Sequence, residues 1–430
     1  MNWSDEETVA QITENPHLQY FIGFPAIQEK APFDASFTIH FRKRLDSSLI
    51  NQVNEWIVEA QMQKTEPKQP KQNDDDDSHG GMASTEKAPL KPNNDPEPTN
   101  QGKLLIDATC VPADIVYPTD LRLLNDAREK LEGMIDTLHE PYQGLQRNPR
   151  TYRKKARKEY LAIAKQRNPR QKTLRKAIGK QLNFVRRNLL QIEKLADPGG
   201  LESLSRRQYR ELLVIQELYH QQRYMHESKT HQVNDWIVSI EQPYVRPIVR
   251  GKADANVEFG AEISVSMVDS FSFLDKLEWN AYHEGKYLQA SVEAYRERNG
   301  AYLEAVFAYQ IYRTRENRAY CKKRGIRLSG PKLGRPSKDA QVNAEQKRIE
   351  YQDAVERNPI EGKFSEGKRK YDLGRISARL QETAETVISL QFLVMNLEKI
   401  LRDTFFSVFS NWINKLFFSQ RKQLINVIQR

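Results

Sequence analysis

The stretch EAVFAYQIYRTREN, residues 304–317, indicates the class of fold by how it changes along its length. It begins with apolar residues in the pattern of a buried strand and ends in the polar run TREN, which is typical of the start of a helix. A buried strand that runs directly into a helix is a unit of an α/β sheet. Tyr309 stands where this strand is expected to end, at the kind of position that often carries chemistry.

The charge of the chain is concentrated in one segment. The 430 residues carry a net charge of +10, and 38% of them are hydrophobic, which is low for a chain long enough for two or three domains. Between Arg147 and Arg187, sixteen Lys or Arg residues accompany a single acid, Glu159, so the local charge is +15 and the remainder of the chain has 10 − 15 = −5. This asymmetry predicts a localised element that binds a polyanion.

Several classes of protein are disfavoured by what the sequence lacks. The two cysteines, Cys110 and Cys321, show no CxxC spacing, so neither a disulfide framework nor a structural zinc site is indicated. The acidic N-terminus, MNWSDEETVAQ, does not resemble a signal peptide. Charged residues interrupt the apolar tract 386–418, so no membrane span is expected. We therefore expect a cytoplasmic protein with no membrane contact.

Composition and periodicity divide the chain into segments. Residues 120–240 have apolar residues at three- and four-residue spacing, which predicts an all-helical block, and residues 62–100 have almost no large apolar side chains, which predicts a disordered linker. The expected segments are a helical N-terminal domain (1–61), the linker (62–100), the first part of a sheet domain (101–119), the basic helical insertion (120–240), the remainder of the sheet domain (241–402) and a helical tail (403–430).

The strands are expected in a defined order. KLLIDATCVP supplies the first strand with Asp107, and YVRPIVRG and FGAEISVSMVDSFSFLDKLEW supply antiparallel strands after the insertion. A helix that ends at Gly300, the strand before Tyr309, a further helix, the short strand IRLSG and a last helix follow. This order predicts an α/β fold, a mixed sheet with a large all-helical insertion.

The basic insertion begins with a short repeat. QRNPR occurs at 146–150 and at 166–170, and each copy precedes a basic stretch interleaved with aromatic residues. One acid among sixteen bases leaves little internal pairing, which favours contact with a nucleic-acid backbone over a merely solvated helix. The residues expected to make this contact are Arg147, Arg150, Arg153, Lys154, Lys155, Arg157 and Lys158.

The segment RNPIEGKFSEGK, residues 357–368, supports two interpretations. Asn358 can cap a helix whose first residue is Pro359 and whose third is Glu361, which is a purely structural role. Yet Glu361 and Lys368 project from one helical face, and Arg357 would join them if the helix extended backward. The two glycines of the segment each cost a helix about 1 kcal/mol, which suits the close approach of a ligand or backbone.

These residues carry a resemblance to a known family. Arg357, Glu361 and Lys368 resemble the arginine, glutamate and lysine of the signature of DDE transposases of bacterial insertion sequences. KLLIDAT resembles the strand of the family's first acid, YRTRENRAYCKKRGIRLSGPKLGRP the segment after its second acid, and LQYFIGFPAIQ and PFDASFTIHFRKRL its N-terminal domain. The resemblance covers most of residues 14–400. The signature's tyrosine, expected three residues before Arg357, is replaced by Ala354.

The resemblance implies a ribonuclease H-like core with an N-terminal helical DNA-binding domain. In such a core, two aspartates and a glutamate hold two divalent ions, Mg²⁺ or Mn²⁺, which assist phosphodiester cleavage and strand transfer. Carried over to this sequence, Asp107 is the first ligand, Glu361 the third, and Arg357 and Lys368 contact DNA phosphate. The implied partners are the terminal inverted repeats of the element and target DNA, bound by a homodimer at the bacterial nucleoid.

The resemblance places Tyr309 where the second aspartate belongs. A phenol with a pKa near 10 is neutral at pH 7 and too bulky for a carboxylate position. No acid lies at residues 305–315, and Glu304 is about 17 Å back along the strand. We therefore expect catalysis to be strongly impaired.

Three functions are compatible with the sequence. The first is an insertion-sequence transposase, and the second is a catalytically inactive DNA-binding derivative that represses or competes with active copies. The third is a basic helical RNA-binding or scaffold protein, which would explain the charge of the insertion but not Asp107, Glu361 and Lys368 in their contexts.

Overall fold

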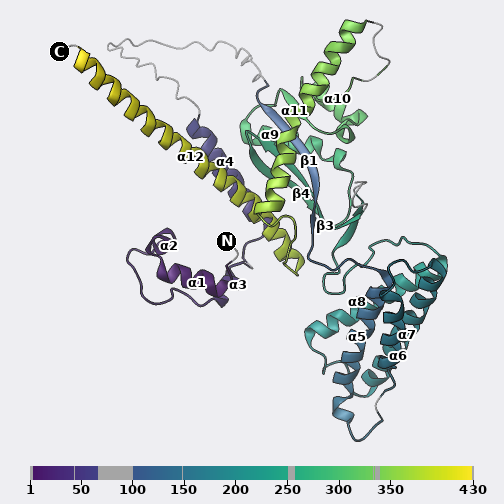
Figure 1. Ribbon diagram of the computed structural model, residues 1–430. Coiled ribbons are helices and arrows are strands. Elements are labelled where there is room, and N and C mark those ends of the chain that lie inside the picture. Colours follow the sequence, from purple (N-terminus) through teal and green to yellow (C-terminus); the bar gives the residue numbers. More distant parts are fainter. Residues whose placement is uncertain are drawn as a thin grey trace, which may run out of the picture.

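A mixed sheet lies at the centre of the molecule, with a helical bundle at one end and a long projecting helix at the other (Figure 1). The structure, a computed structural model, describes residues 3–42, 44–65, 100–147, 149–249, 257–332, 334 and 339–428. Most of the predicted linker, 62–100, lies outside the described residues. None of the helices in these ranges combines the length and the apolar character needed to cross a membrane.

Six strands form one sheet, and the expected mixed α/β class is confirmed. Hydrogen bonds connect the strands in the order β2, β3, β1, β5, β6, and β4 pairs with β3 beside β2. β3 is antiparallel to β1, whereas β5 is parallel to β1 and β6 is parallel to β5. This arrangement is consistent with a ribonuclease H-like core. The strands are β1 (Lys103–Pro112), β2 (Arg246–Val249), β3 (Val257–Val268), β4 (Phe271–Glu278), β5 (Ala305–Phe307) and β6 (Arg327–Leu328).

β1 is central because its apolar side chains are buried on both faces of the sheet. Leu104 and Ile106 pack with α9 (Leu288–Asn299) and α10 (Arg315–Lys323). Leu105 belongs to a second cluster, on the opposite face, with α11 and α12. A strand covered on both faces reads as a continuous apolar run, as KLLI does.

The last two long helices cover the second face, and their bounds differ from those expected. α11 (Ala340–Lys370) begins at the cap Asp339, so the predicted start at Asn358 is wrong and Pro359 lies inside the helix. Pro359 cannot donate a hydrogen bond to the preceding turn, but the flanking Ile360 and Phe364 are buried against the sheet and hold the helix there. α12 (Gln381–Ile428) runs without a break across the expected boundary at 402–403.

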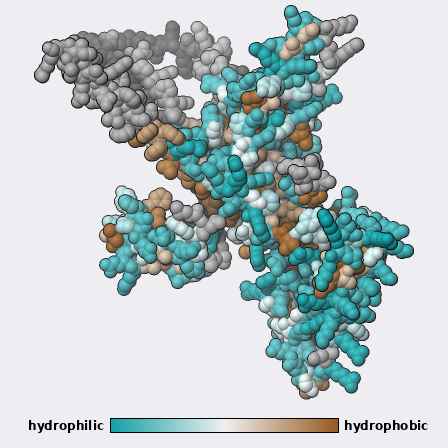
Figure 2. All heavy atoms as spheres, in the orientation of Figure 1, coloured by the Kyte–Doolittle hydropathy of each residue, from teal (hydrophilic) through white to brown (hydrophobic). Residues whose placement is uncertain are grey.

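Four helices between β1 and β2 form a bundle. They are α5 (Asp120–His139), α6 (Arg153–Ala164), α7 (Gln171–Gly199) and α8 (Arg206–Ser228). Three of them, α5, α7 and α8, supply most of a separate hydrophobic core. Arg128 is almost fully buried in α5 and donates to Glu132 at 2.6 Å, so its charge is paired inside the bundle. The bundle presents a mostly hydrophilic surface, whereas hydrophobic residues gather along α12 (Figure 2).

The N-terminal helices divide into two groups. α1 (Asp5–Glu14), α2 (Pro16–Phe21) and α3 (Ser36–Arg42) form a small unit in which Arg42 donates to Asp5 at 2.7 Å. α4 (Ser47–Thr65), which was expected to belong to this unit, packs instead on β4 and α12. Asn396 of α12 donates to Asn54 of α4 and to the Ser272 carbonyl, each at 2.8 Å, and fixes this junction.

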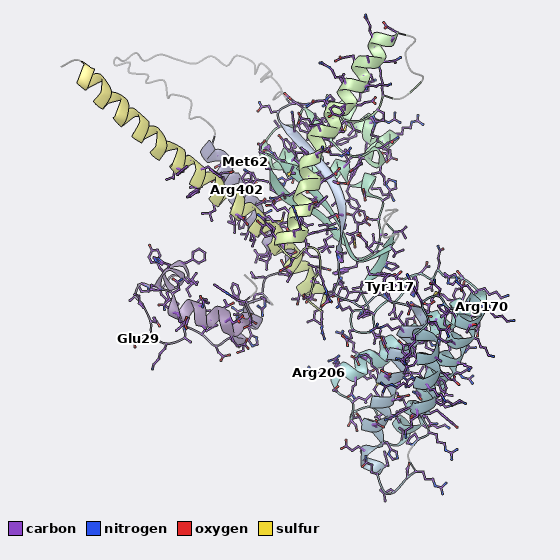
Figure 3. The ribbon with its side chains drawn as sticks, viewed as in Figure 1. Glu29, Met62, Tyr117, Arg170, Arg206 and Arg402 are labelled. Carbon is purple, nitrogen blue, oxygen red and sulfur yellow. The ribbon has the colours of Figure 1, made fainter. Side chains whose placement is uncertain are left out.

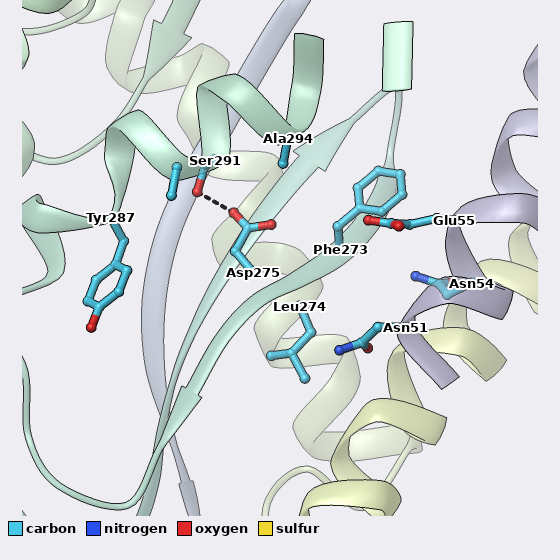
Figure 4. Close-up of a pocket in the computed structure, with 10 residues that line it drawn as sticks. Asn51, Asn54, Glu55, Phe273, Leu274, Asp275, Tyr287, Ser291 and Ala294 are labelled. Carbon is cyan, nitrogen blue, oxygen red and sulfur yellow. Dashed lines mark hydrogen bonds between the residues drawn. The ribbon is translucent and has the colours of Figure 1, made fainter. Parts of the chain in front are cut away.

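A cavity of about 250 Å³ lies at the same junction, between α4, β4 and α9 (Figure 4). Asp275 lies at a bulge in β4 and accepts a hydrogen bond from Ser291 of α9 at 2.5 Å and one from Ser266 at 2.8 Å. Burial raises the pKa of Asp275. Because the two serines already donate to Asp275, its side chain has partners within the protein, and we interpret the cavity as part of the packing of α4 on the core.

Candidate active site

The register of the sheet places Tyr309 beside Asp107. β5 pairs with β1 as far as Phe307, which is opposite Leu105. Tyr309 lies two residues beyond the end of β5, with extended backbone, and continuing the same offset would bring it level with Asp107. Side chains alternate along a strand, so both residues lie on the face that α11 covers. The predicted neighbourhood of the two positions is thus present in the backbone.

Asp107 is held within the buried part of β1. Its side chain is 7% exposed and its Oδ1 accepts a hydrogen bond from the Ala108 amide at 2.8 Å. A carboxylate fixed in this way at the centre of a sheet has little freedom to move, which is what a metal ligand requires.

α11 brings Glu361 to the same face, and contacts far from Glu361 determine its position. Asp353, 6% exposed, accepts from Arg327 of β6 at 2.8 Å and from the Gly330 amide at 3.1 Å. One turn later, Lys103 of β1 donates to Glu356 at 3.1 Å. Asp353 was not predicted as a functional residue, because its only signal in the sequence is an acid in the helix preceding Glu361.

Tyr309, Glu361 and Arg357 form one connected cluster. The Tyr309 hydroxyl donates a hydrogen bond to Glu361 Oε1. The Arg357 guanidinium lies 3.6 Å from the centre of the Tyr309 ring, and its Nη2 is 3.6 Å from the same Glu361 oxygen. Arg357 therefore joins the face of Glu361, because the helix does extend backward through Pro359.

The electrostatics of the cluster keep the phenol protonated. Burial is the largest cause that raises the pKa of Tyr309, and the hydrogen bond to Glu361 and the charges of Glu361 and Asp107 raise it further. Arg357 has the opposite effect. At neutral pH, Tyr309 is thus a hydrogen-bond donor and not an anionic ligand.

These residues do not fit a site for two divalent ions. Two carboxylates, Asp107 and Glu361, lie on the face, and the side chain that contacts Glu361 there is the neutral phenol of Tyr309. The Tyr309 hydroxyl and Arg357 already engage one oxygen of Glu361. Within the described ranges, no group of three or more His, Cys, Asp or Glu side chains could hold a metal ion.

Lys368 and the two glycines complete the signature segment. Lys368 is half-buried and lies about two turns after Glu361 on α11. A Cβ on Gly367 would come within 2.5 Å of Leu373 Cδ1, so this glycine permits close packing inside the protein. A Cβ on Gly362 would meet nothing within 4 Å, which leaves the helix surface beside Glu361 open.

The basic residues of the insertion serve two different roles. Arg153 donates to the Glu132 carbonyl at 2.9 Å and pairs with Asp136, so it fastens α6 to α5. Ala156 is buried, and the cations on the opposite side of α6 are exposed and form no ion pair within the described part of the chain. These exposed residues of α6 are Lys154, Lys155, Arg157 and Lys158, and Arg147 and Arg150 precede the helix and are also exposed.

The chain is similar to known proteins over its two ends. Residues 306–398 match the family described as transposase DDE domain, and residues 1–44 match the family described as transposase domain (DUF772). The first match includes Tyr309, Arg357, Glu361 and Lys368 but not Asp107. The DDE domain implies dependence on a divalent metal, typically Mg²⁺.

A curated protein also matches part of the chain. A protein of Rhizobium meliloti, described as uncharacterized protein ORF8 in the nfe locus, is 30% identical over 128 residues, which are 30% of this chain and 48% of that protein. The match thus spans about half of the relative's length. No solved structure matches the chain significantly. The two transposase matches, at opposite ends of the chain, indicate a DDE transposase of the insertion-sequence type.

Proposed function

We propose that this protein binds the terminal inverted repeats of its element as a transposase and that Tyr309 strongly impairs its strand cleavage and transfer. One observation carries the proposal. Tyr309 follows two residues after β5, which pairs with β1 in parallel, and its hydroxyl donates to Glu361. This geometry supports our assignment of Tyr309 to the position of the second carboxylate.

DNA binding would use surfaces away from this cluster. The exposed cations of α6 face solvent without acidic partners among the described residues, which suits contact with phosphate oxygens. The unit α1–α3 lies within the match to a transposase domain, and we assign it to recognition of the repeats. A homodimer would bring two element ends together with target DNA.

The residues around Tyr309 would position DNA but would not support its cleavage. Arg357 and Lys368 carry positive charge on the helix of Glu361, where they would orient a phosphate group near the cleaved end. Glu361 has one oxygen committed to Tyr309, and no second aspartate completes the set that Asp107 begins. Binding and positioning of DNA are therefore expected to survive while cleavage fails.

A second function follows from the same observation. A transposase that binds element ends without cutting them would occupy the sites of active copies and would repress or compete with them. Tyr309 distinguishes this role from ordinary transposition, because the rest of the fold is common to both.

The test is excision of a marker flanked by the element's own ends, in cells that make the natural protein, Tyr309→Asp or Tyr309→Asn. We expect excision with Tyr309→Asp alone, since asparagine has the size of aspartate but not its charge. Equal excision by the natural protein and Tyr309→Asp would show that Tyr309 does not occupy the second ligand position. Specific binding of the purified natural protein to its ends, against random DNA, tests the repressor role.

A further inference from the structure

An open cleft of about 960 Å³ lies where the helical bundle meets the β2–β3 edge of the sheet. Tyr117, which lines this cleft, is labelled in Figure 3 between the sheet and the bundle. We call it the aromatic cleft and define it by Tyr117, Tyr224, Trp236, Phe259 and Arg246. The rings come from four separate parts of the chain, so only the folded protein brings them together.

The rings of the aromatic cleft are exposed in a way that suits a flat ligand. Tyr117 is 68% exposed and Tyr224 is 56% exposed, although each presents a large ring surface that burial would stabilise. Tyr117 meets Phe259 edge to face, with 5.5 Å between ring centres. Exposed aromatic rings gathered around one hollow are a platform on which planar groups stack.

Two residues that line the cleft carry an unpaired donor. The Trp236 Nε1 and Arg246 Nε atoms are themselves buried and have no acceptor among the described residues. Asp235 also lines the cleft, and its charge acts on Arg246. The opposite charges of Asp235 and Arg246 offset each other, so the cleft does not select strongly for an anion, and a neutral group with hydrogen-bonding edges suits it.

A second cavity, of about 420 Å³, adjoins the aromatic cleft and has the opposite character. We call it the cationic cavity; Lys172 and Arg175 of α7 and Lys229 at the end of α8 line it. His231 lines both hollows and so connects them. Asp120, the one acid among the described residues that line the cationic cavity, accepts a hydrogen bond from Gln222 at 2.8 Å. This cavity would attract a phosphate group.

The aromatic cleft lies on the same face of the sheet as Asp107. The Ala113 amide donates to the Phe259 carbonyl just beyond β1, and Ala113 is six residues from Asp107, so alternation returns it to that face. Six residues of strand span roughly 20 Å, which is about six base-pair steps of B-DNA. The sheet between the two positions is covered by α11 and by the chain that follows it, which packs on Val111 and Ala113. DNA that contacts both positions would therefore pass around these elements.

We propose that the aromatic cleft stacks an unpaired nucleobase of bound DNA and that the cationic cavity holds a neighbouring phosphate. The proposal rests on the proposed function, since it names a contact that DNA would make when its end lies near Asp107. A nucleotide, which is a planar base linked to an anionic phosphate, matches the aromatic cleft and the adjoining cationic cavity. A blunt duplex, whose bases are all paired, would leave the aromatic cleft empty.

The test measures the affinity of the full-length protein for two nucleic acids separately. A fluorescent oligo-dT, which cannot form a duplex, tests the aromatic cleft, and a blunt duplex of the element's end tests the proposed function. The variant Tyr117→Ala/Tyr224→Ala removes two exposed rings, and Tyr209→Ala, 45% exposed at the other end of α8, is the matched control. Lys172→Ala/Lys229→Ala tests the cationic cavity.

We expect the tyrosine pair variant to bind oligo-dT at least about five-fold more weakly, which corresponds to the lower limit of roughly 1 kcal/mol per stacked base. The control and the affinity for blunt duplex should be unchanged, and the lysine pair should reduce the salt dependence of oligo-dT binding. Unchanged oligo-dT affinity in the tyrosine variant, or an equal loss in Tyr209→Ala, would overturn the proposal. Tighter binding of oligo-rU than of oligo-dT would overturn the assignment to DNA.

The two arms can fail separately. If the protein binds oligo-dT through these rings but shows no preference for the element's ends, the proposed function fails and the cleft assignment stands. If it prefers the ends and the tyrosine variant still binds oligo-dT normally, the cleft assignment fails and the proposed function stands.

Discussion

Replacing Tyr309 with aspartate should make the thermal stability of the protein depend on divalent metal. Tyr309→Asp removes the hydroxyl that donates to Glu361 and the ring that Arg357 contacts at 3.6 Å. It places a third carboxylate beside Asp107, across the β1–β5 pair. Without a metal ion, both changes destabilise the folded state.

The magnitude follows from the geometry. The hydrogen bond to a charged group, reduced because Tyr309 is 38% exposed, contributes about 1 kcal/mol, and the cation–π contact contributes roughly 0.5–1 kcal/mol. Two like charges about 5 Å apart on neighbouring strands repel by about 3 kcal/mol at an effective dielectric constant of 20. The sum, roughly 4–5 kcal/mol, corresponds to a fall in Tm of roughly 4–6 °C for a chain of 430 residues.

A bound ion should reverse much of this loss. At a concentration 100 times its Kd, Mg²⁺ or Mn²⁺ would add about 2.7 kcal/mol to the free energy of unfolding, or roughly 3 °C in Tm. Scanning calorimetry of Tyr309→Asp with chelator and then with MgCl₂ measures both effects. The natural protein and Tyr309→Asn should show no such dependence.

A metal effect on the natural protein would contradict this reasoning. If MgCl₂ raises the Tm of the natural protein as much as that of Tyr309→Asp, the cluster of Tyr309 with Glu361 already accepts the ion, and our conclusion that it does not fit a metal site is wrong.

Three further predictions concern other parts of the molecule. Replacing Lys154, Lys155, Arg157 and Lys158 together with alanine should reduce the steepness of log Kobs against log[salt] for duplex DNA by about one per lost contact. Arg153→Ala should mainly lower Tm, because Arg153 pairs with Asp136. Equal salt slopes for the two variants would contradict this division of roles. Asn396→Ala should cost about 2–4 kcal/mol in chemical denaturation, since it leaves the buried Ser272 amide unpaired, while Leu397→Ala, at a side chain that is 42% exposed, should cost clearly less. Burial raises the pKa of Tyr244 to about 12. The stability that the neutral phenol contributes is therefore complete below pH 10 and is lost as the pH rises toward 12. If Tm falls between pH 10 and 12 by the same amount in Tyr244→Phe as in the natural protein, this prediction is wrong.

The sequence by itself determined the elements whose patterns are local. The apolar runs of β1 and of the β3–β4 hairpin predict buried strands, because a strand covered on both faces has few polar positions. The absence of an acid at 305–315 is a property of the sequence alone, and so is the charge of the insertion. The sequence thus predicts the strand before Tyr309, although β5 ends two residues earlier than expected, at Phe307.

Only the tertiary structure decided the features that depend on distant contacts. Local rules start a helix at Pro359, yet α11 begins nineteen residues earlier, at Ala340, because burial of Ile360 and Phe364 on the sheet outweighs one missing hydrogen bond. The bond from Tyr309 to Glu361 joins residues 52 positions apart. Sequence patterns record what each segment prefers, whereas such bonds depend on the packing that brings the segments together.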